Sequence, residues 1–384
     1  MEYIALKDVC KINMGQSPDS SSYNNCKDGM PFFQGNADFG EKYPLTRIWC
    51  KEPIKIAQPS DILISVRAPI GALNYVRETC CIGRGLAAIT PDKSRVSLEF
   101  IYWFLKGKNV ELNSKGTGST FKAISRNVLE EIKVPDIVLD KQQKYAQILE
   151  KIYAVIQMRK YKLQLLDDLI KARFVEMFGD ARENLNGYTM VPFIDIVEYM
   201  GDIGSNGANK VVVDHLEMKD EEDYAMMVRF TNFTKNDFTD DVKYVSKEAY
   251  DFFKKSQIFG GELIICKIGS AGQNYVMPYL NRPVSLGLNQ IMVRIKDNIL
   301  MPYLYQYLHT DYGEFLISGC INGAVTKTIT KTELKKIPVM LPPMELQNEF
   351  AEFVHQVNKS KLKVEESLKK LETLQKSLMQ QYFG

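Results

Sequence analysis

The sequence lacks the features that mark secreted, membrane-bound or zinc-bound proteins. Its seven cysteines are an odd number and none forms a CxxC pair, so we expect reduced thiols without a disulfide framework or a zinc site. No run of about 18 apolar residues is present, as a membrane span would need. The first residues, MEYIALKDVCKINMG, have no apolar signal core. These absences predict a cytoplasmic protein that does not bind a membrane.

The sequence also lacks a strong charge and known catalytic motifs. Its 49 Lys and Arg residues nearly balance 47 Asp and Glu residues, whereas a non-specific DNA-coating protein would be more basic. There is no GxxxxGK[ST] phosphate loop and no Asn-Pro-Pro-aromatic motif of amino-methyltransferases. The histidines, His215, His309 and His355, are far apart and are better explained as surface or core residues. We therefore expect no catalytic residue, metal or cofactor in this chain.

What the sequence does contain is a tandem duplication. Residues 118–179 align with residues 323–384 without a gap, and the aligned pairs include Gln142 with Gln347 and Phe178 with Phe383. A repeat of this length is a domain with its own core rather than a solenoid unit. A pair of domains also suits a chain of 384 residues.

Each copy begins with a mixed α+β part. Strands are predicted where apolar runs follow the turns PSD and GGE, and a short helix follows them in both copies. The predicted strands are 61–66 and 86–90, then 262–268 and 289–295, and the helices are 97–107 and 300–310. We divide the chain into a first globular domain (1–139), a long helix (140–179), a second globular domain (180–344) and another long helix (345–384).

The second part of each copy is one long helix. Residues 140–178 and 345–383 contain neither proline nor glycine, and each stretch stops at a glycine, Gly179 or Gly384. Apolar residues recur in both at alternating spacings of four and three, which is the pattern of a coiled-coil seam. The predicted seam comprises Leu149, Ile152, Ile156, Leu163, Leu166, Ile170, Val354, Val357, Val364, Leu368, Leu371 and Leu378.

These helices are expected to pair with each other. Each could instead pack on its own domain, but a helix of ~58 Å is longer than a small domain is wide. An antiparallel pair related by a pseudo-twofold axis would hold the two similar domains apart, one at each end of a coiled-coil spacer. Heads at a fixed distance suit DNA, where sites one helical turn apart face the same side.

At this point the sequence resembles the specificity subunit of type I restriction-modification enzymes. The resemblance rests on PSDILISVRAPIGALN and GGELIICKIGSAGQ, and on the segments before each long helix, TGSTFKAISRNVLEEIKVPDIVLDKQQ and NGAVTKTITKTELKKIPVMLPPMELQ. It covers nearly the whole chain. The repeated combination of such a segment with a heptad helix is a specific signal of this family, whereas single motifs such as MGQSP are weak signals.

The resemblance implies a division of labour between subunits. Each globular domain would be a target recognition domain that reads one half of a bipartite, asymmetric site in double-stranded DNA. The paired helices would set the spacing and dock two methyltransferase subunits, which would flip the base and methylate adenine N6. Restriction subunits would add ATP-driven translocation and cleavage. S-adenosylmethionine, ATP and Mg²⁺ are therefore expected on the partner subunits, and this chain is expected to be non-catalytic.

Candidate DNA contacts are polar residues in the loops. Forked donors read guanine and amides read adenine, while Lys, Ser and Thr bind phosphate. In the first copy the candidates are Gln16, Ser17, Gln34, Asn36, Arg67, Arg84, Lys115, Thr117, Ser119 and Lys122. In the second copy they are Asn206, Asn232, Lys267, Asn289, Gln290, Asn322, Thr326 and Lys327.

Among these candidates, Arg67 and Arg84 stand beside glycines at strand ends, where a side chain could enter a groove or form an ordinary surface ion pair. Lys122 aligns with Lys327, and a shared lysine suits phosphate contact better than base reading; the alternative is a solvated lysine.

Two other functions stay open. A self-contained methyltransferase or nuclease with fused recognition domains would require the catalytic motifs that the sequence lacks. A bivalent adaptor could use the coiled coil only as a spacer between two sites for a protein or glycan. Binding that is insensitive to salt would favour the adaptor, because DNA binding falls steeply with salt.

Overall fold

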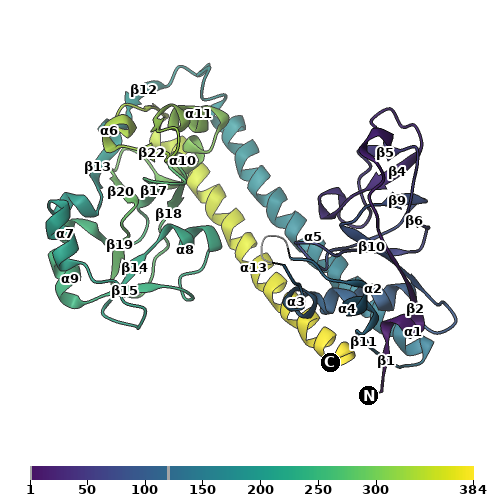
Figure 1. Cartoon of the computed structure of the whole chain (residues 1–384). Coiled ribbons are helices and arrows are strands. Elements are labelled where there is room, and N and C mark those ends of the chain that lie inside the picture. The colour runs from purple at the N-terminus through teal and green to yellow at the C-terminus, as the bar shows by residue number, and fades with distance from the viewer. Residues whose placement is uncertain (1, 119–121) are drawn as a thin grey trace. The chain divides into compact units, whose positions relative to one another are not determined.

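The computed structural model describes residues 2–118 and 122–384. The chain forms two compact units: unit 1 is Met1–Tyr161 with Val364–Gly384, and unit 2 is Lys162–Lys363. Each unit therefore combines one α+β part with a portion of both long helices (Figure 1). The four-part division of the sequence stays a prediction. Within the described ranges no helix is both long enough and apolar enough to cross a membrane.

The main sheet of unit 1 has the strand order β2-β10-β7-β8, with every pair antiparallel. Its strands are β2 (Cys10–Met14), β7 (Ile62–Ser65), β8 (Leu73–Tyr75) and β10 (Leu86–Pro91). Helix α2 (Leu98–Gly107) packs on this sheet, and its apolar residues share one core with those of the strands. The strands and helix predicted for this copy are confirmed, with ends that differ by one or two residues.

The main sheet of unit 2 repeats this order as β13-β20-β17-β18 (Figure 1). The strands are β13 (Val197–Gly201), β17 (Leu263–Cys266), β18 (Asn274–Val276) and β20 (Gln290–Ile295), and helix α10 (Met301–Leu308) covers them. The duplication therefore extends into the parts of the two copies whose sequences have diverged.

A second sheet is repeated as well. Unit 1 has β3-β5-β4-β9-β6, and unit 2 has β15-β14-β19-β16, each built around one parallel pair, β4 with β9 or β14 with β19. These strands are β3 (Tyr23–Asn24), β4 (Met30–Phe33), β5 (Ile48–Cys50), β6 (Ile56–Ala57), β9 (Cys80–Ile82), β14 (Ala225–Val228), β15 (Lys243–Val245), β16 (Gln257–Ile258) and β19 (Val284–Leu286).

Shorter elements complete both units. In unit 1 they are β1 (Tyr3–Ala5), α1 (Leu6–Val9), α3 (Asn109–Ser114), α4 (Arg126–Glu130) and β11 (Lys133–Pro135). In unit 2 they are β12 (Thr189–Pro192), α6 (Phe193–Ile196), α7 (Asn209–His215), α8 (Phe230–Lys235), α9 (Lys247–Phe252), α11 (Asp311–Gly319), β21 (Ile321–Asn322), β22 (Thr328–Ile329), α12 (Lys331–Leu334) and β23 (Pro338–Leu341).

The long helices are α5 (Leu139–Phe178) and α13 (Met344–Phe383), each 40 residues long. Both begin one residue before the predicted start. Both end as predicted at a glycine with positive φ, 75° at Gly179 and 88° at Gly384. A left-handed glycine terminates a helix at little steric cost, because it has no Cβ.

The helices pair antiparallel within each unit, as predicted. In unit 1 the ring of Tyr145, near the start of α5, stacks on Tyr382, near the end of α13, with centroids 3.7 Å apart. In unit 2 the end of α5 lies beside the start of α13, as an antiparallel pair requires. There, Arg173 pairs with Glu349 at 2.6 Å, near the end of α5 and the start of α13.

The residues of the predicted seam are all at least partly buried. Leu149, Ile156, Ile170, Val357 and Val364 are buried, and the other seven predicted seam residues are partly buried. The polar seam position Lys361 forms an ion pair with Asp167 at 2.5 Å. Charged seam positions of this kind oppose shifted pairings, because a slip would leave them without partners.

A buried glutamine near the start of α5 ties the helix to unit 1. The side-chain oxygen of Gln142 accepts the N–H of Ser97, the N-cap of α2, at 2.9 Å. Its amide donates to the carbonyl oxygens of Arg95 (3.0 Å) and Ile137 (2.7 Å). The side chain is 1% exposed, so these bonds are made away from water.

The aligned glutamine of α13 does the same in unit 2. Gln347 accepts the N–H of Leu300, the N-cap of α10, at 2.9 Å and donates to the carbonyl of Pro342 at 2.9 Å. The two glutamines therefore place Ser97 and Leu300, and the helices that follow them, at equivalent positions.

The repeated Phe-Gly ending also has a structural reason. Phe178, at the end of α5, packs against Tyr303 in the core of unit 2, with ring centroids 4.8 Å apart. Phe383, at the end of α13, packs against Phe100 in the core of unit 1, at 5.5 Å. Each long helix thus begins in one unit and ends in the core of the other.

Replacing Gln142 by Leu should lower the free energy of unfolding by about 2–3 kcal/mol, because it leaves a buried N–H and two carbonyl groups without their partner. Urea denaturation followed by circular dichroism measures this. The exposed neighbour Gln143 provides the control, since Gln143→Leu should change stability by less than about 0.5 kcal/mol. Equal effects of the two substitutions would contradict the proposed role of Gln142.

Candidate DNA interface

Loops that are far apart in sequence meet at one edge of unit 1. The N–H of Gly85 donates to the carbonyl of Gln34 at 3.1 Å, and the N–H of Arg84 donates to the hydroxyl of Ser17 at 3.2 Å. The side chains of Gln16, Gln34 and Arg84 are exposed there. Residues predicted separately as DNA contacts are therefore neighbours.

The same edge continues into the loops after β7 and before α4. The N–H of Val66 donates to the carbonyl of Gly85 at 2.9 Å, and the N–H of Ala68 donates to the carbonyl of Lys122 at 3.0 Å. Arg67 and Lys122 are both exposed at this point. We call this surface the unit 1 edge; it comprises Gln16, Ser17, Gln34, Asn36, Arg67, Arg84, Thr117 and Lys122.

The close approach of these loops depends on glycine. A Cβ atom on Gly15 would lie 2.2 Å from the carbonyl oxygen of Gly83, and one on Gly85 would lie 2.4 Å from that of Gln34. Backbone atoms cannot move aside as a flexible side chain would, so any other residue would push the loops apart. These glycines therefore shape the edge.

The remaining candidates of the first copy differ in placement. Thr117 is exposed and forms an isolated bridge with Ala123, which holds it at the edge. Lys115 forms an ion pair with Glu111 at 2.6 Å, so a carboxylate already balances its charge. Ser119 lies outside the described residues.

Unit 2 has an edge built on the same backbone frame. The N–H of Gly269 donates to the carbonyl of Lys327 at 3.0 Å, and the N–H of Lys267 donates to the carbonyl of Asn289 at 2.8 Å. These bonds correspond to the Ala68 and Val66 bonds of unit 1. Asn289, Asn322, Thr326 and Lys327 are exposed on this unit 2 edge.

The shared backbone frame shows which side chains of the two units are equivalent. At two of these positions, one unit has a charged side chain and the other has an apolar one. Arg67, between the bonded residues Val66 and Ala68, corresponds to Ile268. Arg84, which precedes Gly85, corresponds to Leu288. Ile268 is 37% exposed and Leu288 is 42% exposed. The unit 2 edge therefore presents apolar groups where the unit 1 edge presents guanidinium groups.

Beside Leu288 the unit 2 edge is hollowed. The hollow has a volume of about 420 Å³ and is lined by Met218, Met227 and Phe230 together with Ile268. Apolar side chains at this density on a surface are a common property of binding sites.

Two candidates of the second copy lie inside the fold, and a third, Asn206, is partly buried. Asn232 is 2% exposed and caps the start of α8, and Gln290 is 1% exposed. The amide of Asn206 bonds the hydroxyl of Ser256 at 2.7 Å and accepts the N–H of Lys255 at 3.0 Å. None of the three presents a fully available amide at the edge, so direct base contact by these residues stays a prediction without support from their placement.

Sequence reasoning missed a buried acid behind the unit 2 edge. Asp202, whose side chain is 6% exposed, binds the ammonium groups of Lys267 at 2.7 Å and Lys331 at 2.9 Å. Burial by itself would raise the pKa of Asp202, but hydrogen bonds from Lys267, Lys331 and Ser205 outweigh it and lower the pKa to about 2. No sequence signal joins residues this far apart. Lys267, a predicted DNA contact, is thus anchored by Asp202.

No cluster of three or more His, Cys, Asp or Glu side chains suited to a metal ion occurs in residues 2–118 and 122–384.

Replacing Asp202 by Asn should lower the free energy of unfolding at pH 7 by about 2 kcal/mol. Because the folded pKa lies below the ordinary value of 3.8, the carboxylate stabilises the fold above about pH 4, and this contribution is lost as the pH falls towards 2. Urea midpoints at pH 7 and pH 3 should therefore show a smaller gap between the two proteins at pH 3. A gap that does not change with pH would contradict this account.

Comparisons with known proteins agree with this architecture. The family model of the type I restriction modification DNA specificity domain matches residues 1–167 and 185–375. The putative type I restriction enzyme MjaX specificity subunit of Methanocaldococcus jannaschii is 44% identical over 156 residues, which are 40% of this chain and only 37% of that protein. The type I restriction enzyme EcoBI specificity subunit of Escherichia coli is 20% identical over an alignment that covers 92% of this chain and 78% of that protein.

The fold is also found in a solved structure. The crystal structure of the type I restriction-modification S subunit from M. genitalium matches 100% of this chain and 96% of that chain, with a TM-score of 0.59 and 14% identity. At this identity the likeness concerns the fold alone. The family model, in contrast, matches most of the chain in two segments, as the resemblance in the sequence predicted. The chain therefore belongs to the family of type I restriction-modification specificity subunits.

Proposed function

We propose that each unit reads one half of a bipartite, asymmetric DNA site through its edge. The observation that carries this proposal is that both edges have the same backbone frame and different exposed side chains. A conserved frame with variable side chains is what two readers of different sequences require. The chain itself would perform no catalysis.

The chemistry of the edges predicts different half-sites. Arg67 and Arg84 can each donate two hydrogen bonds to the O6 and N7 atoms of guanine, and the amides of Gln16 and Gln34 can pair with adenine. Ile268 and Leu288 offer no donor, but apolar side chains of this kind contact the methyl group of thymine. We therefore expect guanine in the half-site of unit 1 and thymine in the half-site of unit 2.

The shared lysines suit a shared task. Lys122 and Lys327 are exposed and their carbonyl groups accept equivalent backbone bonds, so their side chains start from the same place on each edge. The phosphate groups of DNA are the same whatever the base sequence. A lysine that contacts a phosphate group would therefore hold the protein in position without selecting bases.

Methyltransferase subunits would dock on the long helices. Outside its seam, α5 exposes a second set of apolar residues at heptad-related spacing, Ile148, Val155, Met158, Leu165 and Leu169, which are 37–68% exposed. An apolar stripe on a helix is normally covered by another element. We propose that helices of two methyltransferase subunits cover it. Those subunits would bind S-adenosylmethionine and methylate adenine N6, and restriction subunits would use ATP and Mg²⁺.

Sequencing the methylated adenines after co-expression with the methyltransferase subunit should show a two-part motif with a constant gap. Arg84→Ala should relax one position in the half of unit 1, at a cost of about 1–3 kcal/mol for the preferred base. Lys122→Ala should weaken binding to all sequences alike and reduce the salt dependence of the binding constant by about one phosphate equivalent.

The control for this experiment is Lys7→Ala. Lys7 is exposed on α1, which precedes the start of β2, whereas the unit 1 edge lies beyond the end of β2. Loss of the Lys7 side chain should therefore leave the methylation motif and the DNA affinity unchanged. The absence of any motif, together with salt-insensitive binding to another ligand, would favour a bivalent adaptor instead.

Replacing Met158 by Asp should weaken the association with the methyltransferase subunit by roughly tenfold or more, because a charge would enter an apolar interface. Analytical ultracentrifugation of the purified subunits measures this. Gln164 is exposed on a different face of α5, so Gln164→Asp should leave assembly unchanged. If both variants assemble like the unmodified chain, the stripe is not the docking surface.

A further inference from the structure

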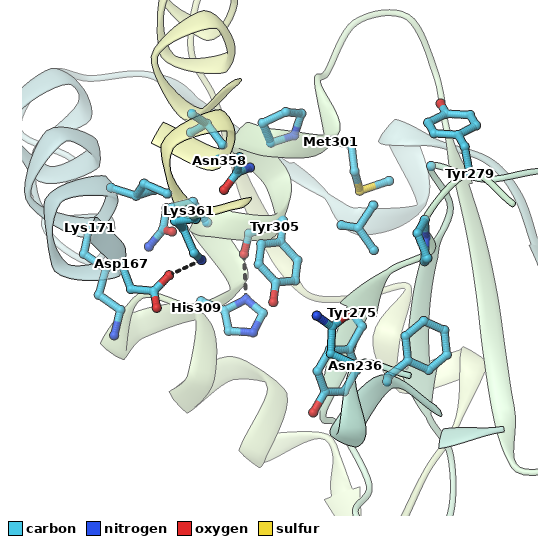
Figure 2. Close-up of a pocket in the computed structure, with 18 of the residues that line it drawn as sticks. Asp167, Lys171, Asn236, Tyr275, Tyr279, Met301, Tyr305, His309, Asn358 and Lys361 are labelled. Carbon is cyan, nitrogen blue, oxygen red and sulfur yellow. Dashed lines mark hydrogen bonds and ion pairs between the residues drawn. The ribbon is translucent and has the colours of Figure 1, made fainter. Parts of the chain in front are cut away.

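A large cavity lies in unit 2 between the main sheet, α10 and the parts of α5 and α13 that belong to this unit. Its volume is about 860 Å³, which is within the range of sites for small molecules. Figure 2 shows the rings of Tyr275, Tyr279 and Tyr305 around it, with Lys171 and Lys361 on the side of the long helices. The DNA edges described above do not include these residues.

Because of the duplication, residues that line this cavity can be compared with their equivalents in unit 1. The glutamine bonds make Ser97 equivalent to Leu300, so Trp103 of α2 corresponds to Gln306 of α10, and Lys106 corresponds to His309. The repeat that aligns Gln142 with Gln347 likewise makes Tyr153 equivalent to Asn358.

The sheets supply one further equivalence. Tyr75 is paired with Ile62, the first residue of β7, and Val276 is paired with Leu263, the first residue of β17. Tyr75 of unit 1 therefore corresponds to Val276 of unit 2.

In unit 1 these large side chains fill the space. The ring of Tyr75 stacks on Tyr102 with centroids 4.3 Å apart, and the edge of Trp103 meets Tyr153 at 5.6 Å. The ammonium group of Lys106 lies 4.0 Å from the centroid of Tyr153. Trp103 is fully buried, so the region is a packed core.

In unit 2 the space is vacant because Val276, Gln306, His309 and Asn358 are smaller. Tyr305 keeps the place of Tyr102, and the ring of His309 lies against it with centroids 4.1 Å apart, but Val276 provides no ring at the position of Tyr75. Loss of several buried rings would be strongly destabilising if nothing replaced them. Three of the four smaller residues, Gln306, His309 and Asn358, are polar. A simple loss of packing would not require an amide or an imidazole at these positions.

Two polar side chains at the end of α10, Gln306 and His309, line the cavity. Gln306 is 8% exposed and lines the cavity, so its amide can donate and accept hydrogen bonds there. His309 donates from Nδ1 to the carbonyl of Tyr305 at 2.8 Å, because a carbonyl can only accept, and burial lowers the pKa of His309.

The charge of the cavity favours an anion. Its wall contains Lys171 and Lys361 but a single carboxylate, Asp167, and Asp167 pairs with Lys361. Within the part of the chain that the structure describes, Lys171 forms no ion pair. A ligand that combines a flat ring with a negative group would meet both properties of the site.

We propose that this cavity binds a nucleotide. The base would occupy the space that Tyr75 and Trp103 fill in unit 1 and stack on Tyr305. Gln306 and Asn358 would hydrogen-bond its edge, and Lys171 would bind its phosphate. Aromatic rings that stack on bases, combined with positively charged groups that bind the backbone, are how proteins hold single-stranded nucleic acid, and the same contacts are available to one nucleotide here. The nucleotide could be a free mononucleotide or an unstacked nucleotide of a DNA strand, because both have the same chemistry.

Isothermal titration calorimetry of the full chain with AMP, ATP, GTP and a short single-stranded oligonucleotide tests the proposal. Gln306→Trp restores the side chain that closes the space in unit 1 and should abolish binding. Lys171→Ala should weaken it roughly tenfold, since one charge-assisted hydrogen bond is lost. Lys162, exposed on the same helix outside the cavity, provides the matched control, and Lys162→Ala should bind like the unmodified chain.

The mononucleotides and the oligonucleotide distinguish the two possible sources of the bound nucleotide. Saturable binding of a mononucleotide that is sensitive to both cavity variants identifies a free nucleotide. Binding of only the oligonucleotide, with the same sensitivity, identifies a nucleotide of DNA. If neither ligand binds, or if Gln306→Trp leaves binding unchanged, the proposal is wrong.

Thermal unfolding shows whether Gln306→Trp is folded. If it is not, Asn358→Tyr provides a second test, because Asn358 is exposed on α13 and tyrosine is its counterpart in unit 1.

Discussion

The structure depends on one constraint: the core of each unit is completed by the end of a helix that begins in the other unit. Phe178 enters the core of unit 2 and Phe383 enters that of unit 1, while Gln142 and Gln347 tie the helix starts to their own units. Both helices are 40 residues long, and each ends with an aromatic residue that is buried in a core. This coupling explains why the helices and the segments before them kept a recognisable repeat while the rest diverged.

Divergence has acted on side chains and has left the backbone frame in place. Equivalent backbone bonds hold the loops of both edges, and glycines let those loops approach closely. On this frame, two arginines of unit 1 are replaced by Ile268 and Leu288 in unit 2. The interiors differ as well: Gln306 stands where unit 1 has Trp103, and a cavity is present there in unit 2. A duplicated frame therefore supports different surfaces, and different interior sites, without a change of fold.

Part of the candidate site could be predicted from the sequence. Arg67 and Arg84 were proposed because they stand at strand ends near glycines, and Lys122 and Lys327 because they align in the duplication; both cues can be read from the sequence, and all four side chains are exposed at the edges. The placement of Asn232 and Gln290 in the interior was not predicted, because an asparagine or glutamine in a loop has the same sequence signal whether its amide faces water or caps a helix. Asp202 was missed because its lysine partners are distant along the chain.

The sequence by itself determined the duplication, the α+β character of both units and the bounds of the long helices to within one residue. These properties follow from periodicity and from proline and glycine, which act through local backbone geometry. Only the tertiary structure decided which loops form each edge, which polar residues are buried, and where Val276, Gln306, His309 and Asn358 leave a cavity. Such properties depend on hydrogen bonds and packing between residues far apart in the sequence, and no local pattern specifies them.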